Sequence, residues 1–117
     1  MAMSAELNGY PGPLHTLELA SQLELSDEQL ARTKQLYADM QTHAKAVGAQ
    51  VIAAERELDT LFLEKRANPD NLSLAVYQAA HAQGKLRETH LRYHLLMMDV
   101  LSAEQIAAYN KLRGYAD

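Results

Sequence analysis

The chain has 117 residues, 48% of them hydrophobic and 22% charged, a length that fits one domain or a hairpin of long helices and excludes a two-domain enzyme with its own cofactor domain. Aromatic residues make up only 6%, and tryptophan and cysteine are absent, which argues against all-β folds and excludes disulfides, thiolate metal ligands and a cysteine nucleophile. A formal net charge of −4 gives no general attraction for nucleic acid, so we expect no nucleic-acid partner.

Residues 1–13 are expected to form a flexible N-terminal segment. They lack the basic start and apolar centre of a secretory signal, and they end in the turn-forming sequence Asn8-Gly9-Tyr10-Pro11-Gly12-Pro13. Leucines at helical spacings then predict a short helix from residue 14 to near Glu24, with Pro13 suited to its first turn.

A long helix is predicted to begin at the capping sequence Ser26-Asp27-Glu28-Gln29. The serine hydroxyl can accept the Gln29 amide hydrogen, and the Gln29 side chain can reach back to the Ser26 amide. No proline follows until Pro69, and a seam of apolar or small residues recurs at alternating spacings of four and three: Thr33, Tyr37, Met40, Ala44, Val47, Val51, Ala54, Leu58 and Leu61. A seam of roughly 40 residues is typical of a helix that packs along its length against a partner.

The sequence Ala67-Asn68-Pro69-Asp70-Asn71 is the strongest internal break and predicts a tight turn. A second long helix is expected after it, with the seam Leu72, Val76, Ala79, Gln83, Leu86, His90, Tyr93, Met97 and Val100. A second capping sequence, Ser102-Ala103-Glu104-Gln105, then begins a short helix that stops at Gly114.

These elements predict an all-α protein, a long antiparallel helical hairpin with short N- and C-terminal helices in a single domain over residues 14–115. Two long helices cannot bury such wide apolar stripes by themselves. We therefore expect both the short helices and a second copy of the chain to cover them, in a homodimer. A monomeric four-helix bundle is the alternative.

Two nearly identical pentapeptides bracket the predicted hairpin. Leu25-Ser26-Asp27-Glu28-Gln29 and Leu101-Ser102-Ala103-Glu104-Gln105 differ at one position. Over residues 14–115 this arrangement resembles the Spy/CpxP family of periplasmic stress proteins and its Leu-Thr-x-x-Gln signature, with serine in place of threonine at both sites. The resemblance implies a helical homodimer in the periplasm that acts as an ATP-independent chaperone for unfolding proteins, or senses envelope stress with regulatory partners. It extends to heavy-metal resistance and sensor proteins of the ZraP and CnrX kind.

The sequence contains no signature of catalysis. It lacks a glycine-rich phosphate loop, GxSxG and HExxH, and the acidic residues Glu55, Glu57 and Asp59 alternate with Arg56 as on a solvated helix face. We expect no enzymatic activity. No stretch reaches the roughly 20 apolar residues of a membrane span, so we expect none in this chain.

Histidine and methionine are the candidate metal ligands. His90, His94 and Met98 stand at i, i+4 and i+8, so they follow one another along one helix face, and imidazole with thioether suits zinc, copper or nickel. His15 on the first short helix is a further candidate. The alternative is that the histidines are ordinary interface residues and the methionines fill the core.

The expected pairing of the two long helices adds two candidate ligands. Antiparallel pairing about residue 69 places His94 opposite Ala44, beside His43, and Met98 opposite Met40. On this pairing His43 and Met40 would join the metal candidates of the second long helix.

A chaperone needs a surface where apolar and basic side chains alternate. On a concave dimer face the candidate client-binding residues are Leu30, Arg32, Lys34, Met40, Lys45, Arg87, Leu91 and Arg92. The alternative is that the basic residues are simply solvated and the apolar ones buried. A third possibility is a plain helical interaction module that contacts its partner through Tyr37 and Tyr93.

Overall fold

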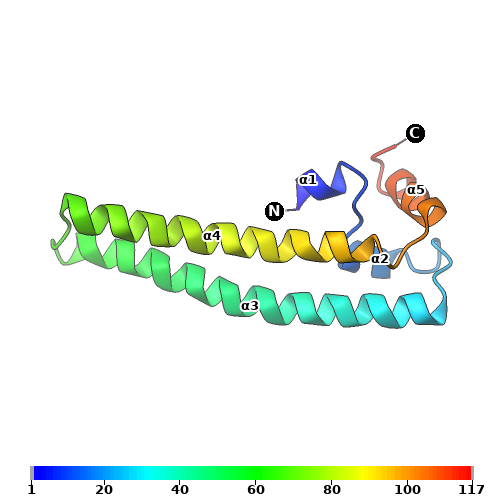
Figure 1. Ribbon diagram of the computed structural model, residues 1–117, viewed down its shortest axis with the longest axis horizontal. Coiled ribbons are helices and arrows are strands. Elements are labelled where there is room, and N and C mark those ends of the chain that lie inside the picture. Colours follow the sequence, from blue (N-terminus) through cyan, green and yellow to red (C-terminus); the bar gives the residue numbers. More distant parts are fainter. Residues whose placement is uncertain (1, 117) are drawn as a thin grey trace. The chain divides into compact units, whose positions relative to one another are not determined.

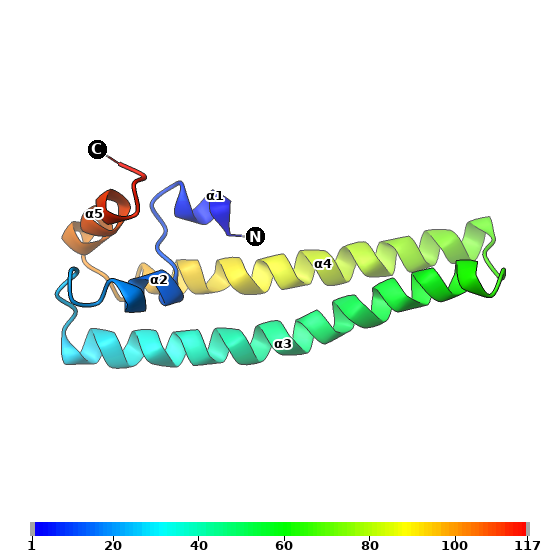
Figure 2. The same cartoon turned by 180° about the vertical axis from the view of Figure 1, so that it is seen from behind.

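The computed structural model describes residues 2–116 (Figures 1 and 2). Within them all regular secondary structure is helical: α1 (Met3–Glu6), α2 (Pro13–Glu18), α3 (Asp27–Leu63), α4 (Pro69–Met97) and α5 (Ala103–Leu112). The two long helices, α3 and α4, run antiparallel and pack against each other (Figure 1). The all-α class and the helical hairpin are therefore confirmed.

The chain divides into two compact units. One contains the described residues up to Gln41 together with those from His90 onward, and the other is Thr42–Thr89. The first unit holds α1, α2 and α5 with the adjoining ends of α3 and α4. The second unit holds the turn of the hairpin.

The core of the first unit is built on the side chains of Leu36, Tyr93, Met97 and Leu101, all of them buried. Partly buried residues from five places in the chain pack against this cluster. They are Leu25 just before the first capping sequence, Met40 of α3, Leu96 of α4, Val100 in the turn after α4, and Ile106 of α5. Each half of the hairpin and α5 thus contributes apolar area to one core.

The second unit has a core of mostly small residues. Val47 and Leu61 of α3 are buried, together with Ala75, Ala79 and Ala82 of α4. The predicted seam of α3 is confirmed, since all its members are buried or half-buried. The predicted α4 seam is confirmed at Ala79, which is buried, but it is wrong at Leu72, Val76 and Gln83, which are exposed, whereas Ala75 and Ala82 are buried.

The turn of the hairpin lies before Pro69. α3 ends at Leu63, and Lys65 takes a left-handed conformation with φ of 56°. Asn68 then caps α4, because its Oδ1 accepts the Asn71 amide at 2.9 Å while Asn71 Oδ1 accepts the Asn68 amide at 2.8 Å. Pro69 is consequently the first residue of α4 and not the middle of the turn.

Met40 packs against the cluster that contains Tyr93 and Met97, and it lines one pocket together with His90 and His94. Met98 is not on α4 at all, since the helix ends at Met97 and the Met98 amide bonds to the Leu95 carbonyl as the chain turns.

Two further boundaries differ from expectation near the N-terminus. α2 ends at Glu18 instead of Glu24, and the residues between them form turns that end at Glu24 with φ of 53°. The segment before residue 14, expected to be flexible, contains the helical turn α1 and the buried carboxylate of Glu6.

Candidate functional site

The two Leu-Ser-x-Glu-Gln pentapeptides both form capping boxes. Gln29 Oε1 accepts the Ser26 amide at 3.0 Å and Gln105 Oε1 accepts the Ser102 amide at 2.9 Å. In return each serine hydroxyl accepts the amide of its glutamine at 3.1 Å. The helix starts of α3 and α5 are thereby satisfied by local side chains.

The same two glutamines join the boxes to each other. Gln29 Nε2 donates to Gln105 Oε1 at 2.7 Å, and Gln105 Nε2 donates to Gln29 Oε1 at 3.0 Å. Each Nε2 also reaches a backbone carbonyl near the other box, Val100 for Gln29 at 2.9 Å and Leu23 for Gln105 at 3.2 Å. A single capping box needs no such partner, so this reciprocal amide pair gives a physical reason for the motif to occur twice.

A pocket of about 240 Å³ in the first unit gathers most of the candidate metal ligands. His15 from α2, Met40 from α3, and His90 and His94 from α4 all line it. The remaining walls come from the N-terminal residues and from the segment after α5, including Arg113 and Tyr115. We call this cavity the histidine pocket.

His94 is held in a defined orientation at this pocket. It is buried, and its Nδ1 lies 2.8 Å from the Tyr10 carbonyl oxygen. A carbonyl can only accept, so Nδ1 is the donor and Nε2 of the neutral ring keeps its lone pair. The ring edge lies against Gly12, where an added Cβ would stand 2.7 Å from Cε1 and 2.9 Å from Nε2.

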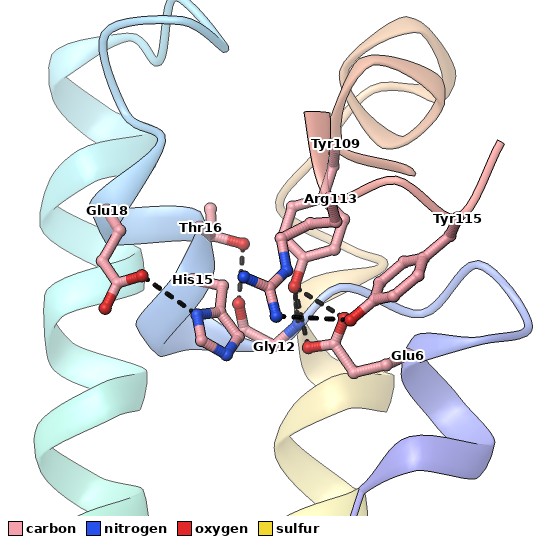
Figure 3. Close-up of polar contacts among 8 residues, drawn as sticks. All are labelled: Glu6, Gly12, His15, Thr16, Glu18, Tyr109, Arg113 and Tyr115. Atoms are coloured by element: carbon pink, nitrogen blue, oxygen red, sulfur yellow. Dashed lines mark hydrogen bonds and ion pairs between the residues drawn. The ribbon is translucent and has the colours of Figure 1, made fainter. Parts of the chain in front are cut away.

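His15 is oriented in a similar way. Its Nδ1 lies 3.0 Å from Glu18 Oε2, one turn further along α2 (Figure 3). An ionised carboxylate only accepts, so His15 Nδ1 also donates and its Nε2 carries the lone pair in the neutral ring. Such outer hydrogen bonds are the usual way in which a protein orients metal-ligating histidines. His90 is half-buried at the same pocket.

The other candidate ligands lie elsewhere. Met98 is half-buried in the turn after α4, and His43 is exposed on α3 within the Thr42–Thr89 unit. Between residues 2 and 116 no three His, Asp or Glu side chains are arranged as a set that could hold a metal ion. Met40, a soft donor that the expected pairing of the long helices also placed among these ligands, lines the histidine pocket.

A buried polar contact closes the N-terminal side of the pocket. The Tyr109 hydroxyl lies 2.7 Å and 2.8 Å from the two carboxylate oxygens of Glu6, and the Gly12 amide points at the same hydroxyl at 3.5 Å (Figure 3). Burial raises the pKa of Tyr109 well above its usual range, and the hydrogen bond to Glu6 raises it further. No sequence pattern predicts this contact, because its partners are 103 residues apart.

The candidate client-binding residues divide between the two units. In the first unit Leu30, Met40 and Leu91 are half-buried, whereas Arg32, Lys34 and Arg92 are exposed. Lys45 and Arg87 are exposed in the second unit. Arg32 contacts Gln35 at 3.2 Å on its own helix. Of the two residues suggested for an interaction module, Tyr37 is half-buried and Tyr93 is buried in the core.

Several large apolar side chains of the second unit are exposed. Leu63 is 77% exposed and Tyr77 is 71% exposed. The exposed set, which we call the distal apolar set, is Ile52, Phe62, Leu63, Leu72, Leu74, Val76 and Tyr77. Two of these residues, Leu72 and Val76, were expected in the α4 seam; the other five had no expected role.

No family model, no curated protein and no solved structure matches this chain. Of the helices described between residues 2 and 116, none combines the length and the apolar character that crossing a bilayer demands.

Proposed function

We propose that this protein is a stress-related binding protein of the Spy/CpxP type, a periplasmic homodimer that holds partly unfolded proteins without ATP or senses envelope stress. The observation that carries the proposal is the distal apolar set, which leaves seven large side chains at the surface of a unit whose own core is filled by alanines. A surface of this kind suits weak, dispersed contacts with exposed apolar segments of a client. The paired capping boxes support the same reading, because they account for the repeated pentapeptide on which the resemblance rests.

The chaperone activity is tested by mixing the dimer with a chemically denatured model protein at near-stoichiometric ratio and following light scattering without ATP. The wild-type chain is expected to suppress aggregation. The double variant Leu74→Ser with Tyr77→Ser should lose most of that effect, because both side chains belong to the distal apolar set.

The matched control is Leu7→Ser with Leu112→Ser. These leucines are also exposed but lie in the other unit, so this variant should keep the activity. Equal loss in both variants, or no suppression by a correctly folded wild-type chain, contradicts the proposal.

A second candidate function, binding of zinc, copper or nickel, is favoured by the histidine pocket. Three imidazoles and a thioether line one cavity, and two of the imidazoles have Nδ1 engaged by an outer acceptor. These donors suit late first-row metals. The side chains are not in a ready-made coordination arrangement, so metal binding would have to reorient His15 and His90 toward His94.

Calorimetric titration with each metal separates this candidate from the first. His15→Ala should weaken metal binding by roughly tenfold or more, because the loss of even an outer hydrogen bond at a metal site lowers metal affinity by about that factor. His81→Ala, which changes an exposed histidine in the other unit, should leave affinity unchanged. Identical affinities in both variants and the wild-type chain would remove the histidine pocket from consideration as a metal site.

A further inference from the structure

A stripe of residues runs along α4 on a different face from its buried alanines Ala75, Ala79 and Ala82. Its members alternate at spacings of three and four, and we call them the outer stripe: Leu74, Tyr77, His81, Gly84, Glu88, Leu91 and Leu95. Leu91 is half-buried and the other six are exposed. The outer stripe is therefore a second seam of the kind that packs along another helix, and it belongs to one continuous helix.

The outer stripe is nearly symmetric about Gly84. A polar side chain comes first on each side of it, His81 before and Glu88 after. Large apolar side chains follow at both ends, Leu74 and Tyr77 in one direction and Leu91 and Leu95 in the other. Such a stripe matches itself in an antiparallel copy, since apolar ends meet and the His81 imidazole can donate to a Glu88 carboxylate. A parallel copy would set Glu88 against Glu88, and like charges oppose that arrangement.

Gly84 has no packing role within the chain itself. A Cβ added to it would meet no atom within 4 Å, and glycine lowers the stability of a helix relative to alanine. In an antiparallel pair Gly84 lies at the two-fold axis, where the missing side chain lets the two helix backbones approach closely. The pair therefore gives a reason for glycine at this position.

Each half of the outer stripe also borders a cavity. Leu91 and Leu95 line a cavity of about 290 Å³ together with Tyr10. Tyr77 and His81 line another of about 370 Å³ together with Ala54 of α3. Side chains that fill such cavities in a partner form the buried centre of a stable interface.

We propose that the outer stripe is the contact face of the homodimer, in which two copies of α4 pack antiparallel about Gly84. This inference rests on the homodimer proposed above and adds the face that forms it. Leu74 and Tyr77 of the distal apolar set lie on the outer stripe, and the other five members lie outside it. The double variant Leu74→Ser with Tyr77→Ser should therefore lose the dimer as well as the chaperone activity.

Sedimentation equilibrium of two single variants separates the dimer face from the client surface. Leu95 is 61% exposed and outside the distal apolar set, so Leu95→Glu should fold normally. It should raise the dissociation constant of the dimer roughly tenfold or more, because a charge replaces an apolar contact. Leu63→Glu, at a 77% exposed member of the distal apolar set off the outer stripe, should keep the dimer and weaken the suppression of aggregation.

These outcomes distinguish the two proposals. A monomeric wild-type chain overturns the dimer face, as does an unchanged dissociation constant in folded Leu95→Glu, whatever the aggregation assay shows. A wild-type dimer that Leu95→Glu disrupts, but that does not suppress aggregation, keeps the dimer face and contradicts the chaperone activity alone.

Disulfide cross-linking tests the orientation and the centre of the pair, since the chain contains no cysteine of its own. Under mild oxidation Gly84→Cys should join two copies roughly tenfold faster than Gln83→Cys, because a disulfide needs close Cα atoms and position 83 lies on another helix face.

A mixture of two single-cysteine variants completes the test. Leu74→Cys mixed with Leu95→Cys should give a mixed disulfide dimer, whereas neither variant alone should, because these positions are about 30 Å apart along the helix. Equal rates in Gly84→Cys and Gln83→Cys overturn the proposal, as does a disulfide of Leu74→Cys with itself. If Leu95→Glu fails to fold by circular dichroism, these rates decide alone.

Discussion

Gly12 and Gly84 show how differently the same residue type is used in this chain. Gly12 is buried against the His94 ring, with an added Cβ only 2.7 Å from the nearest ring atom. Gly84 lies within α4, where an added Cβ meets nothing within 4 Å. The close approach of the His94 ring requires glycine at position 12, whereas within one chain glycine at position 84 only lowers the stability of the helix.

Alanine substitutions should therefore act in opposite directions. Gly12→Ala is expected to lower the free energy of unfolding by about 1–3 kcal/mol, because either the ring or the backbone must move. Gly84→Ala should raise it by about 0.5–1 kcal/mol through the restricted unfolded chain. Urea titration followed by circular dichroism measures both, and a tolerated Gly12→Ala would contradict the described packing.

Tyr109 makes the free energy of unfolding depend on pH in the alkaline range. Its folded-state pKa lies above the unfolded value of about 10, so the folded chain holds this proton more tightly than the unfolded chain does. The resulting stability is complete below pH 10 and declines as pH rises further. Urea midpoints measured at pH 8 and pH 11 should show a smaller decline in Tyr109→Phe than in wild type. Tyr77→Phe, at an exposed position, should keep the wild-type decline.

At the scale of elements, the reciprocal pair of Gln29 and Gln105 links the starts of α3 and α5. Each glutamine side chain makes two kinds of bond. It accepts the amide of the serine in its own capping box, and it bonds the glutamine of the other box. Removing one glutamine therefore leaves groups of the other without partners.

A double-mutant cycle tests this coupling. Gln29→Ala and Gln105→Ala should each destabilise the chain, and the double variant should be less destabilised than the sum by about 0.5–3 kcal/mol. Gln29→Ala combined with Gln83→Ala, which alters an exposed glutamine in the other unit, should be additive. Additivity in both combinations would mean that the two boxes act separately.

Local patterns were enough to predict the two long helices, the C-terminal helix and both capping boxes, but not α1. The α3 seam and the boxes at Ser26 and Ser102 depend on residues close in sequence, which periodicity and capping chemistry describe directly. The α4 seam was wrong at Leu72, Val76 and Gln83, because Ala75 and Ala82 are the buried residues there. Met98 was expected on the helix face of His90 and His94, but α4 ends at Met97. Met40 lines the histidine pocket, near His94 as expected.

The remaining features of the site depend on contacts that no local pattern reports. Glu6 and Tyr109 are 103 residues apart, and His94 and Tyr10 are 84 apart. Neither pair has a spacing or motif of its own, so only the tertiary fold brings them together.

At the scale of the whole molecule, the proposed homodimer predicts the mass of the protein in solution. The distal apolar set leaves seven large apolar side chains exposed, part of which a second copy of the chain would cover in the proposed dimer. Sedimentation velocity over a wide concentration range should show a species with twice the mass of one chain. A compact monomer at every concentration would contradict the dimer and favour the monomeric bundle.

The long sequence separations at the histidine pocket also set an order of events in folding. The turn at Asn68 closes a small loop, whereas the bonds of Glu6 with Tyr109 and of Tyr10 with His94 close loops of 103 and 84 residues. Closing large loops costs the most chain entropy, so these bonds should form after the transition state. Tyr109→Phe should consequently accelerate unfolding and leave the refolding rate nearly unchanged. The N-terminal end of the chain is then the last part to dock during folding and the first to detach during unfolding.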